Sequence, residues 1–160
     1  MFTDSTLMFL HAETSVHLGS GQSGGAVDLA VQRERHTDFP VGAASGLKGA
    51  VRSWFRAHDD AGHDDKRYAA FGPDTANASD HAGAVAFTDA RLLLFPVRAM
   101  KGVFAWTTCP TILNRLRRDL DAAGRDVSWT VPEPGDDQAL GTESNVNESG
   151  NEILLEENYF

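Results

Sequence analysis

The residues best suited to chemistry lie in the first third of the chain. One carboxylate, Asp28, stands in an otherwise apolar run over residues 26–31, and Arg33, Arg35 and His36 follow it. A carboxylate in apolar surroundings costs free energy unless it is paired or hydrated. It can activate a hydroxyl as a general base, or hold Mg²⁺ together with substrate phosphates; the alternative is an aspartate at a strand edge that points to solvent. The neighbouring cations suit a polyanionic substrate.

A loop rich in glycine and alanine, residues 41–49, opens directly into an expected helix that carries Lys48 and Arg52. Small residues let main-chain amides approach a ligand, and a helix start supplies unpaired N–H groups and the positive end of the helix dipole. With the two cations, these groups would form a cradle for phosphate. An ordinary capped helix after a flexible loop is the alternative. His17, at the end of the first expected strand, could move a proton, contact phosphate, or be a structural hydrogen-bonding residue.

Two other features carry weaker signals. Residues 58–65 hold two histidines and four aspartates, but their spacing matches no established metal-binding pattern, and we interpret residues 59–66 as a polar break. Cys109 precedes an expected helix start and is interpreted as a capping or packing residue, because no cysteine–histidine arrangement is evident.

Composition sets the outer limits. A chain of 160 residues, 41% of them hydrophobic, is enough for one domain with a buried core. The chain has no apolar run of ~18 residues and no basic start typical of a signal peptide, and it has a single cysteine. Together these features predict a protein of the reducing cytoplasm. The net charge of −9 is uneven: residues 131–160 hold eight acids and no lysine or arginine, which leaves 15 acids against 14 bases in residues 1–130. The first part therefore permits a local basic patch for nucleic acid. The acidic end is interpreted as a solvated face, with contact to a basic partner as the alternative.

Hydrophobic patterns place these residues on strands and two helices. Strands are expected at residues 7–12, 84–87, 91–97, 103–106 and 153–155, and helices from a Ser45 cap to about His58 and from Pro110 to a stop at Gly124. With the second and third of these strands taken as one bulged strand, the order is β-α-β-β-α-β. This is the ferredoxin-like α+β arrangement, which also builds RNA-recognition domains. We expect residues 1–130 to form this core, residues 131–150 an acidic loop, and residues 151–160 the last strand.

Several runs resemble a known family. The run from Val27 to Pro40, with Gln-Arg-Glu-Arg-His-Thr at its centre, and residues 45–52 are similar to the RAMP backbone subunits of type III-B CRISPR effector complexes, the fourth subunit of the Cmr complex. Further matches, which extend the resemblance over nearly the whole chain, lie at residues 71–73, 94–103, 113–120 and 154–157. Members of this family run on for roughly as many residues again. The resemblance therefore implies a RAMP fold that is incomplete at its C-terminus, with the rest of the family domain absent.

The resemblance implies a role in antiviral defence. Copies of the subunit would stack along a CRISPR guide RNA as a filament, together with the other Cmr subunits, and would cut complementary single-stranded target RNA. A divalent metal, Mg²⁺ or Mn²⁺, would act at Asp28, with His17 and Lys48 as catalytic residues in the same site. RNA binding is expected of Arg33, Arg35, His36, Ser45, Gly46, Lys48, Gly49, Arg52, Arg98 and Lys101.

The chemistry of RNA fits this assignment. The 2′-hydroxyl can attack its own neighbouring phosphate, so the enzyme needs only a base or metal near that hydroxyl and positive charge near the phosphate. Two alternatives remain: a guide-RNA-binding fragment that assembles without cutting, and, apart from the resemblance, a small α+β protein that binds a phosphate ligand. No membrane partner is expected.

Overall fold

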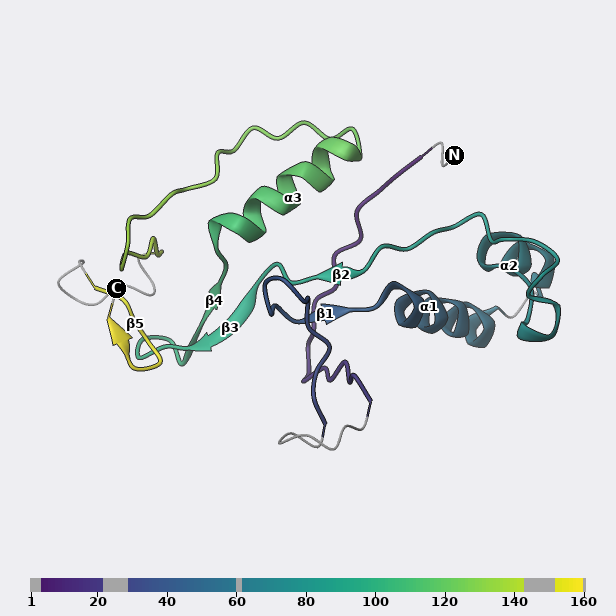
Figure 1. Ribbon diagram of the computed structural model, residues 1–160, viewed down its shortest axis with the longest axis horizontal. Coiled ribbons are helices and arrows are strands. Elements are labelled where there is room, and N and C mark those ends of the chain that lie inside the picture. The colour runs from purple at the N-terminus through teal and green to yellow at the C-terminus, as the bar shows by residue number, and fades with distance from the viewer. Residues whose placement is uncertain (1–3, 22–28, 60–61, 143–151, 160) are drawn as a thin grey trace. The chain divides into compact units, whose positions relative to one another are not determined.

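The structure, a computed structural model, describes residues 4–21, 29–59, 62–142 and 152–159 (Figure 1). The chain divides into two compact units, one of residues 14–91 and the other of residues 1–13 together with residues 92–160. Among the described helices, none combines the length and the apolar character needed to cross a membrane.

The unit of residues 14–91 combines short antiparallel pairings with two helices. Three pairings link its extended segments in chain order: Gly19 with Val31, Arg33 with Pro40, and β1 (Val41–Gly42) with β2 (Ala90–Arg91). The helices are α1 (Ala44–His58) and α2 (Asp64–Phe71), followed by a short 3₁₀ helix (Thr75–Asn77). The rings of Phe55 and Phe71 lie 5.7 Å apart between centroids and pack α1 against α2.

The other unit is built around a hairpin and one long helix. Its elements are β3 (Phe95–Arg98), β4 (Phe104–Thr107), α3 (Pro110–Ala122), β5 (Leu154–Leu155) and β6 (Asn158–Tyr159). β3 pairs with β4, β5 pairs with β6, and a bridge from Ala99 to Leu155 joins the two hairpins. The buried apolar side chains among the described residues are Ala99, Ile112 and Ile153. They lie just after β3, in the first turn of α3 and just before β5.

Local sequence signals predicted several of these elements correctly. The strands expected at residues 91–97 and 103–106 overlap β3 and β4, which pair as a hairpin. Pro110 occupies the first position of α3, where a missing N–H is tolerated. Helix α3 ends before Gly124, and α1 ends at His58, as expected. β5 lies within the last expected strand.

The strand expected at Leu7–Ala12 is wrong, because these residues form no strand. Their side chains are largely exposed: Met8 is 51% exposed, Phe9 63% and Leu10 60%. A strand that is apolar on both faces needs neighbours on both faces and a hydrogen-bonding partner at its edge. Within the described ranges, no strand pairs with this segment.

The polar break at residues 59–66 is only partly correct, since α2 begins inside it. Asp59 accepts a hydrogen bond from the main-chain N–H of His63 (2.6 Å) just before the helix. Asp64 and Asp65 occupy its first turn, where carboxylates are stabilised by the positive end of the helix dipole. Arg67 adds an ion pair with Asp64 one turn later.

The strand expected at Ala84–Phe87 is also wrong, because its first amides bond elsewhere. The N–H groups of Ala84 and Val85 donate to the carbonyls of Ala69 and Ala70 at the end of α2, both at 2.9 Å. The preceding Gly83 passes so close to this helix end that a Cβ there would lie 2.5–2.6 Å from its main-chain atoms. The segment therefore terminates α2 instead of joining a sheet.

Candidate nucleic-acid interface

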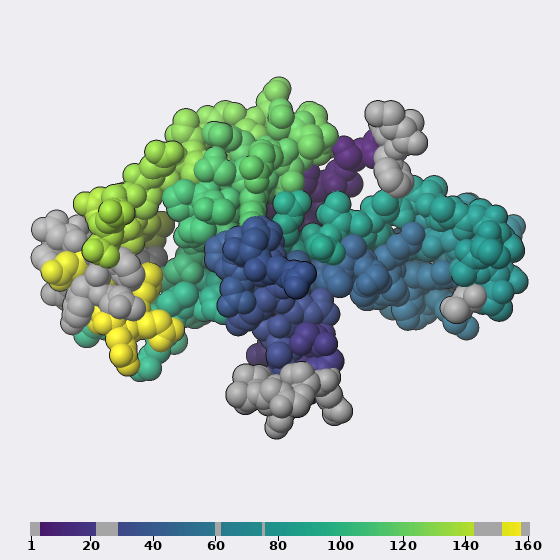
Figure 2. Space-filling model, viewed as in Figure 1, coloured from purple at the N-terminus to yellow at the C-terminus, as the bar shows by residue number. Residues whose placement is uncertain are grey.

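A tight hairpin formed by residues 32–41 presents the expected cations. Its main-chain hydrogen bonds run from Glu34 N to the Phe39 carbonyl, from Asp38 N to the Glu34 carbonyl (both 2.9 Å), and from Val41 N to the Gln32 carbonyl (3.0 Å). Arg35 and His36 lie at the hairpin tip and are exposed. The space-filling view shows this dark-blue stretch at the surface of its unit (Figure 2).

Glu34 lies beneath the hairpin tip. Its side chain is 10% exposed, accepts a hydrogen bond from the Thr37 hydroxyl, and lies 3.7 Å from His36 Nε2. Arg33 donates from Nη1 to the Asp38 carbonyl at 2.7 Å on the opposite strand of the hairpin. The largely shielded Glu34 carboxylate and the Arg33 hydrogen bond therefore brace the hairpin, while the side chains of Arg35 and His36 are exposed.

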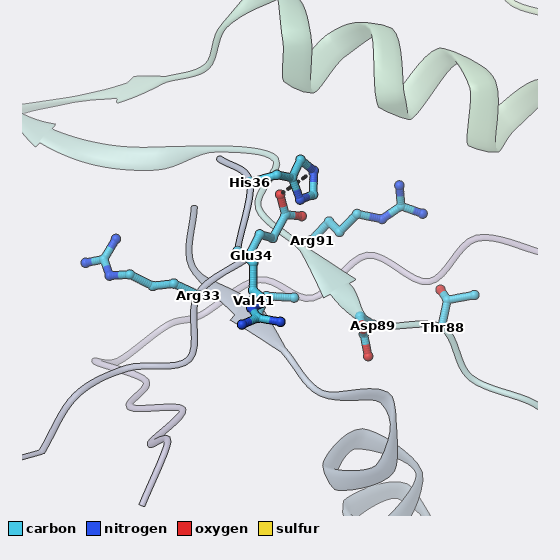
Figure 3. A pocket seen from close by; sticks show the side chains of 8 residues that line it. Arg33, Glu34, His36, Val41, Thr88, Asp89 and Arg91 are labelled. Atoms are coloured by element: carbon cyan, nitrogen blue, oxygen red, sulfur yellow. Dashed lines mark ion pairs between the residues drawn. The ribbon is translucent and has the colours of Figure 1, made fainter. Parts of the chain in front are cut away.

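A shallow groove runs beside this hairpin. It is lined by Arg33, Glu34, Arg35, His36, Val41, Thr88, Asp89 and Arg91. In Figure 3, Glu34 and His36 face each other, whereas the guanidinium groups of Arg33 and Arg91 extend to opposite sides. Cations that diverge in this way do not converge on one phosphate, and they suit an extended polyanion with several phosphates.

The amino end of α1 differs from the expected phosphate cradle. Ala43 is the N-cap residue and Ser45 lies inside the helix, so the expected Ser45 cap is wrong. The Ala44 N–H instead donates to Asp89 Oδ1 at 2.8 Å, and the Ala43 N–H donates to Gln32 Oε1 at 3.3 Å. A carboxylate from a distant segment thus performs the capping that a local serine was expected to supply.

The small residues that follow remain open to solvent. Ser45, Gly46 and Gly49 are exposed, and a Cβ added at either glycine would lie within 4 Å of no other described segment. Lys48 is partly exposed on the same helix. This part of the expected RNA surface is therefore accessible, although the first two main-chain amides are used internally.

Arg52 has a different environment from Lys48, four residues away. Its Nη2 lies 2.8 Å from Asp74 Oδ1, and its Nη1 donates to the Pro73 carbonyl at 3.0 Å. Asp74 is itself held by the Tyr68 hydroxyl, which donates to Oδ2 at 3.0 Å. Arg52 therefore ties α1 to the segment after α2, whereas Lys48 makes no hydrogen bond or ion pair within the described residues.

Replacing Arg52 with alanine is expected to lower the free energy of unfolding by about 1 kcal/mol, because one hydrogen bond and one partly exposed ion pair are lost. Lys48→Ala should leave stability nearly unchanged. Thermal denaturation of both variants measures the difference, and equal midpoints would contradict a structural role for Arg52.

His17 lies next to the segment that follows Asp28. Its Nε2 is 3.1 Å from the Leu29 carbonyl oxygen, and a Cβ at Gly19 would lie 3.1 Å from His17 Cε1. Asp28, the expected catalytic and metal-binding residue, lies outside the described residues. Within the described part of the chain, no group of three or more His, Cys, Asp or Glu side chains gathers as a metal site.

Arg98 and Lys101 belong to the other unit. The main chain of Arg98 bonds to Glu156 at the end of β5, with Glu156 N donating to the Arg98 carbonyl at 2.8 Å. Lys101 lies in the turn between β3 and β4, before Gly102 and Val103, both of which have positive φ angles. Their expected RNA contacts stay a prediction.

Sequence reasoning missed five residues at this site: Gln32, Glu34, Thr88, Asp89 and Arg91. Gln32 and Glu34 lie inside the quoted motif, but only their neighbours carry a positive charge. Thr88, Asp89 and Arg91 reach the site through the pairing of β1 with β2, which no local pattern signals.

The comparisons with known proteins identify the family. The sequence matches the RAMP superfamily over residues 9–157. The chain therefore belongs to the RAMP superfamily, and its expected α+β, ferredoxin-like RAMP fold is confirmed.

Particular relatives narrow the comparison. The chain is 41% identical over 152 residues to the CRISPR system Cmr endoribonuclease Cmr4 of Pyrococcus furiosus, covering 94% of this chain and 50% of that protein. It is similar to oligomeric Cmr4 from P. furiosus (TM-score 0.72, 35% identity, 89% of this chain and 49% of that chain). It is also similar to a chain of the type III-B Cmr-beta complex bound to cognate target RNA (TM-score 0.59, 28% identity, 68% and 39%). The resemblance to the fourth Cmr subunit is confirmed, and the chain spans about half the length of these relatives.

Proposed function

We propose that this chain acts as a type III-B CRISPR backbone subunit. Copies of it bind guide RNA in a filament with other Cmr subunits, and each cuts complementary target RNA. The observation that carries the proposal is the hairpin at residues 32–41, which exposes Arg35 and His36 and in which the Glu34 carboxylate lies 3.7 Å from His36 Nε2. Its likeness to Cmr4, and to a chain from a complex bound to target RNA, supports the same assignment.

The residues divide the work of cutting. Cations beside the groove hold the sugar–phosphate backbone and leave sequence recognition to base pairing. Asp28 activates the 2′-hydroxyl, directly or as a ligand of Mg²⁺ or Mn²⁺, while Lys48 and His17 stabilise charge at the phosphate. Mg²⁺ commonly takes one or two carboxylates together with substrate phosphates, so a single protein carboxylate fits this ion. When bound, the metal supplies a Lewis acid at the reacting phosphate.

A guide-RNA scaffold that does not cut is the second candidate. The accessible hairpin cations and the partly exposed Lys48 suit this role, because it requires only contacts to the RNA backbone. The two candidates share the RNA-binding groove and differ only in catalysis.

RNA binding by the chain provides the first test. Single-stranded RNA of filament length is expected to bind with an affinity that falls steeply with salt, by a log–log slope of about 0.7 per phosphate contact. Fluorescence anisotropy with labelled RNA and with a labelled mononucleotide measures both affinities. Preference for the mononucleotide would contradict the proposal and favour a protein for small phosphate ligands.

A further inference from the structure

Gln32 makes hydrogen bonds on both sides of its segment. Its main-chain N–H donates to the Leu18 carbonyl (2.8 Å), and its main-chain carbonyl accepts from Val41 N (3.0 Å). The side chain bonds the same two segments at other residues. Nε2 donates to the Gly19 carbonyl at 2.8 Å, and Oε1 accepts from Ala43 N at 3.3 Å. One residue thus joins three segments of this unit.

The two segments that this side chain links carry the expected catalytic residues. His17 lies two residues before Gly19, and Lys48 lies five residues after Ala43, on α1. We propose that Gln32 is a positioning residue, which holds the segment of His17 in register with the start of α1 so that both groups face one RNA strand. The inference rests on the proposed function, because it assigns Gln32 to the RNA site.

The chemistry of the side chain makes the role specific. A primary amide has a donor and an acceptor on the same terminal group, so it can bond a carbonyl on one side and an N–H on the other. Ionised glutamate accepts but cannot donate, and its charge would repel the Gly19 carbonyl. Methionine has a similar length and provides neither strong bond. Gln32→Met therefore removes both links, and Gln32→Glu keeps only the one to Ala43.

The test uses the complex reconstituted with guide RNA and the other Cmr subunits. Gln32→Met should slow single-turnover target cutting by about 100-fold, the scale expected when reacting groups shift by about 1 Å. The Kd for target RNA should change much less, since the outward cations are untouched. Amide hydrogen exchange gives a readout independent of activity: exchange at Ala43 should accelerate in Gln32→Met and stay near wild type in Gln32→Glu.

Gln138→Met serves as the matched control, because Gln138 Oε1 also accepts a main-chain N–H, that of Gly135 at 3.1 Å, but in the other unit. Its cutting rate should equal that of the wild type. If Gln32→Met does not fold, the Gln32→Glu variant provides the test. Slower cutting by Gln32→Glu with normal target binding supports the positioning role, and cutting at the wild-type rate overturns it. A wild-type complex that neither binds nor cuts RNA would contradict the proposed function itself.

Discussion

Asp28→Ala in the reconstituted complex is expected to abolish the regular cuts in target RNA while target binding stays near normal. A positioned general base contributes roughly 10²–10⁴-fold to a rate, so the loss of this carboxylate should reduce cutting on that scale. Chelation of divalent metal should have the same effect if the carboxylate acts as a metal ligand. Denaturing gels of end-labelled target measure the cuts, and filter binding measures the affinity.

Asp28→Asn and Asp38→Asn form a matched pair for this experiment. Asp38 is an exposed aspartate in the hairpin at residues 32–41, with a φ angle of 61°, a conformation that asparagine also tolerates. Its replacement removes the same charge from the same unit but leaves Asp28 in place, so the regular cuts should persist. Cuts that persist at the same positions in Asp28→Asn and Asp28→Ala would refute the assignment of Asp28.

Arg35→Ala combined with Lys48→Ala is expected to weaken RNA binding and to flatten its salt dependence. Each lost phosphate contact lowers the log–log slope by about 0.7 for single strands, so the pair should lower it by about 1.4. Neither side chain bonds to another described residue, so the fold should survive both changes. Titrations of labelled RNA at several salt concentrations measure the slope.

Arg117→Ala with Arg118→Ala provides the charge-matched control. Both arginines are exposed on α3, in the other unit, and line a different shallow groove. Removing them changes the net charge by the same amount. An equal change of slope in the two double variants would mean that RNA responds to total charge, and would contradict specific contacts at Arg35 and Lys48.

Parts of the fold that depend on neighbouring residues could be predicted from the sequence. The β3–β4 hairpin needs only a turn between two apolar runs, and α3 needs only Pro110 at its start and an apolar face. By contrast, α2 depends on Asp59 and on the return of residues 83–85 to its last carbonyls. Leu7–Ala12 has the composition of a strand, but composition alone does not provide the partner that a strand requires.

The same distinction applies to the site. Arg33, Arg35 and His36 are adjacent in the chain, so their clustering followed directly from the sequence. The capping of α1 by Asp89 joins residues 45 positions apart, and it depends on the pairing of β1 with β2. The sequence analysis places Lys48 and Arg52 together in one phosphate cradle, whereas the structure gives Arg52 an ion pair with Asp74, a partner that the local sequence does not indicate.

The two open glycines of α1 have a thermodynamic consequence. In a helix interior, glycine is less favourable than alanine by about 0.8–1 kcal/mol per residue. A methyl group at Gly49 in the helix interior, or at Gly46 in its first turn, would lie within 4 Å of no other described segment, so no packing there offsets this loss. These glycines therefore lower the stability of α1. Because they carry no side chain, an incoming strand can come into van der Waals contact with the peptide groups along this stretch.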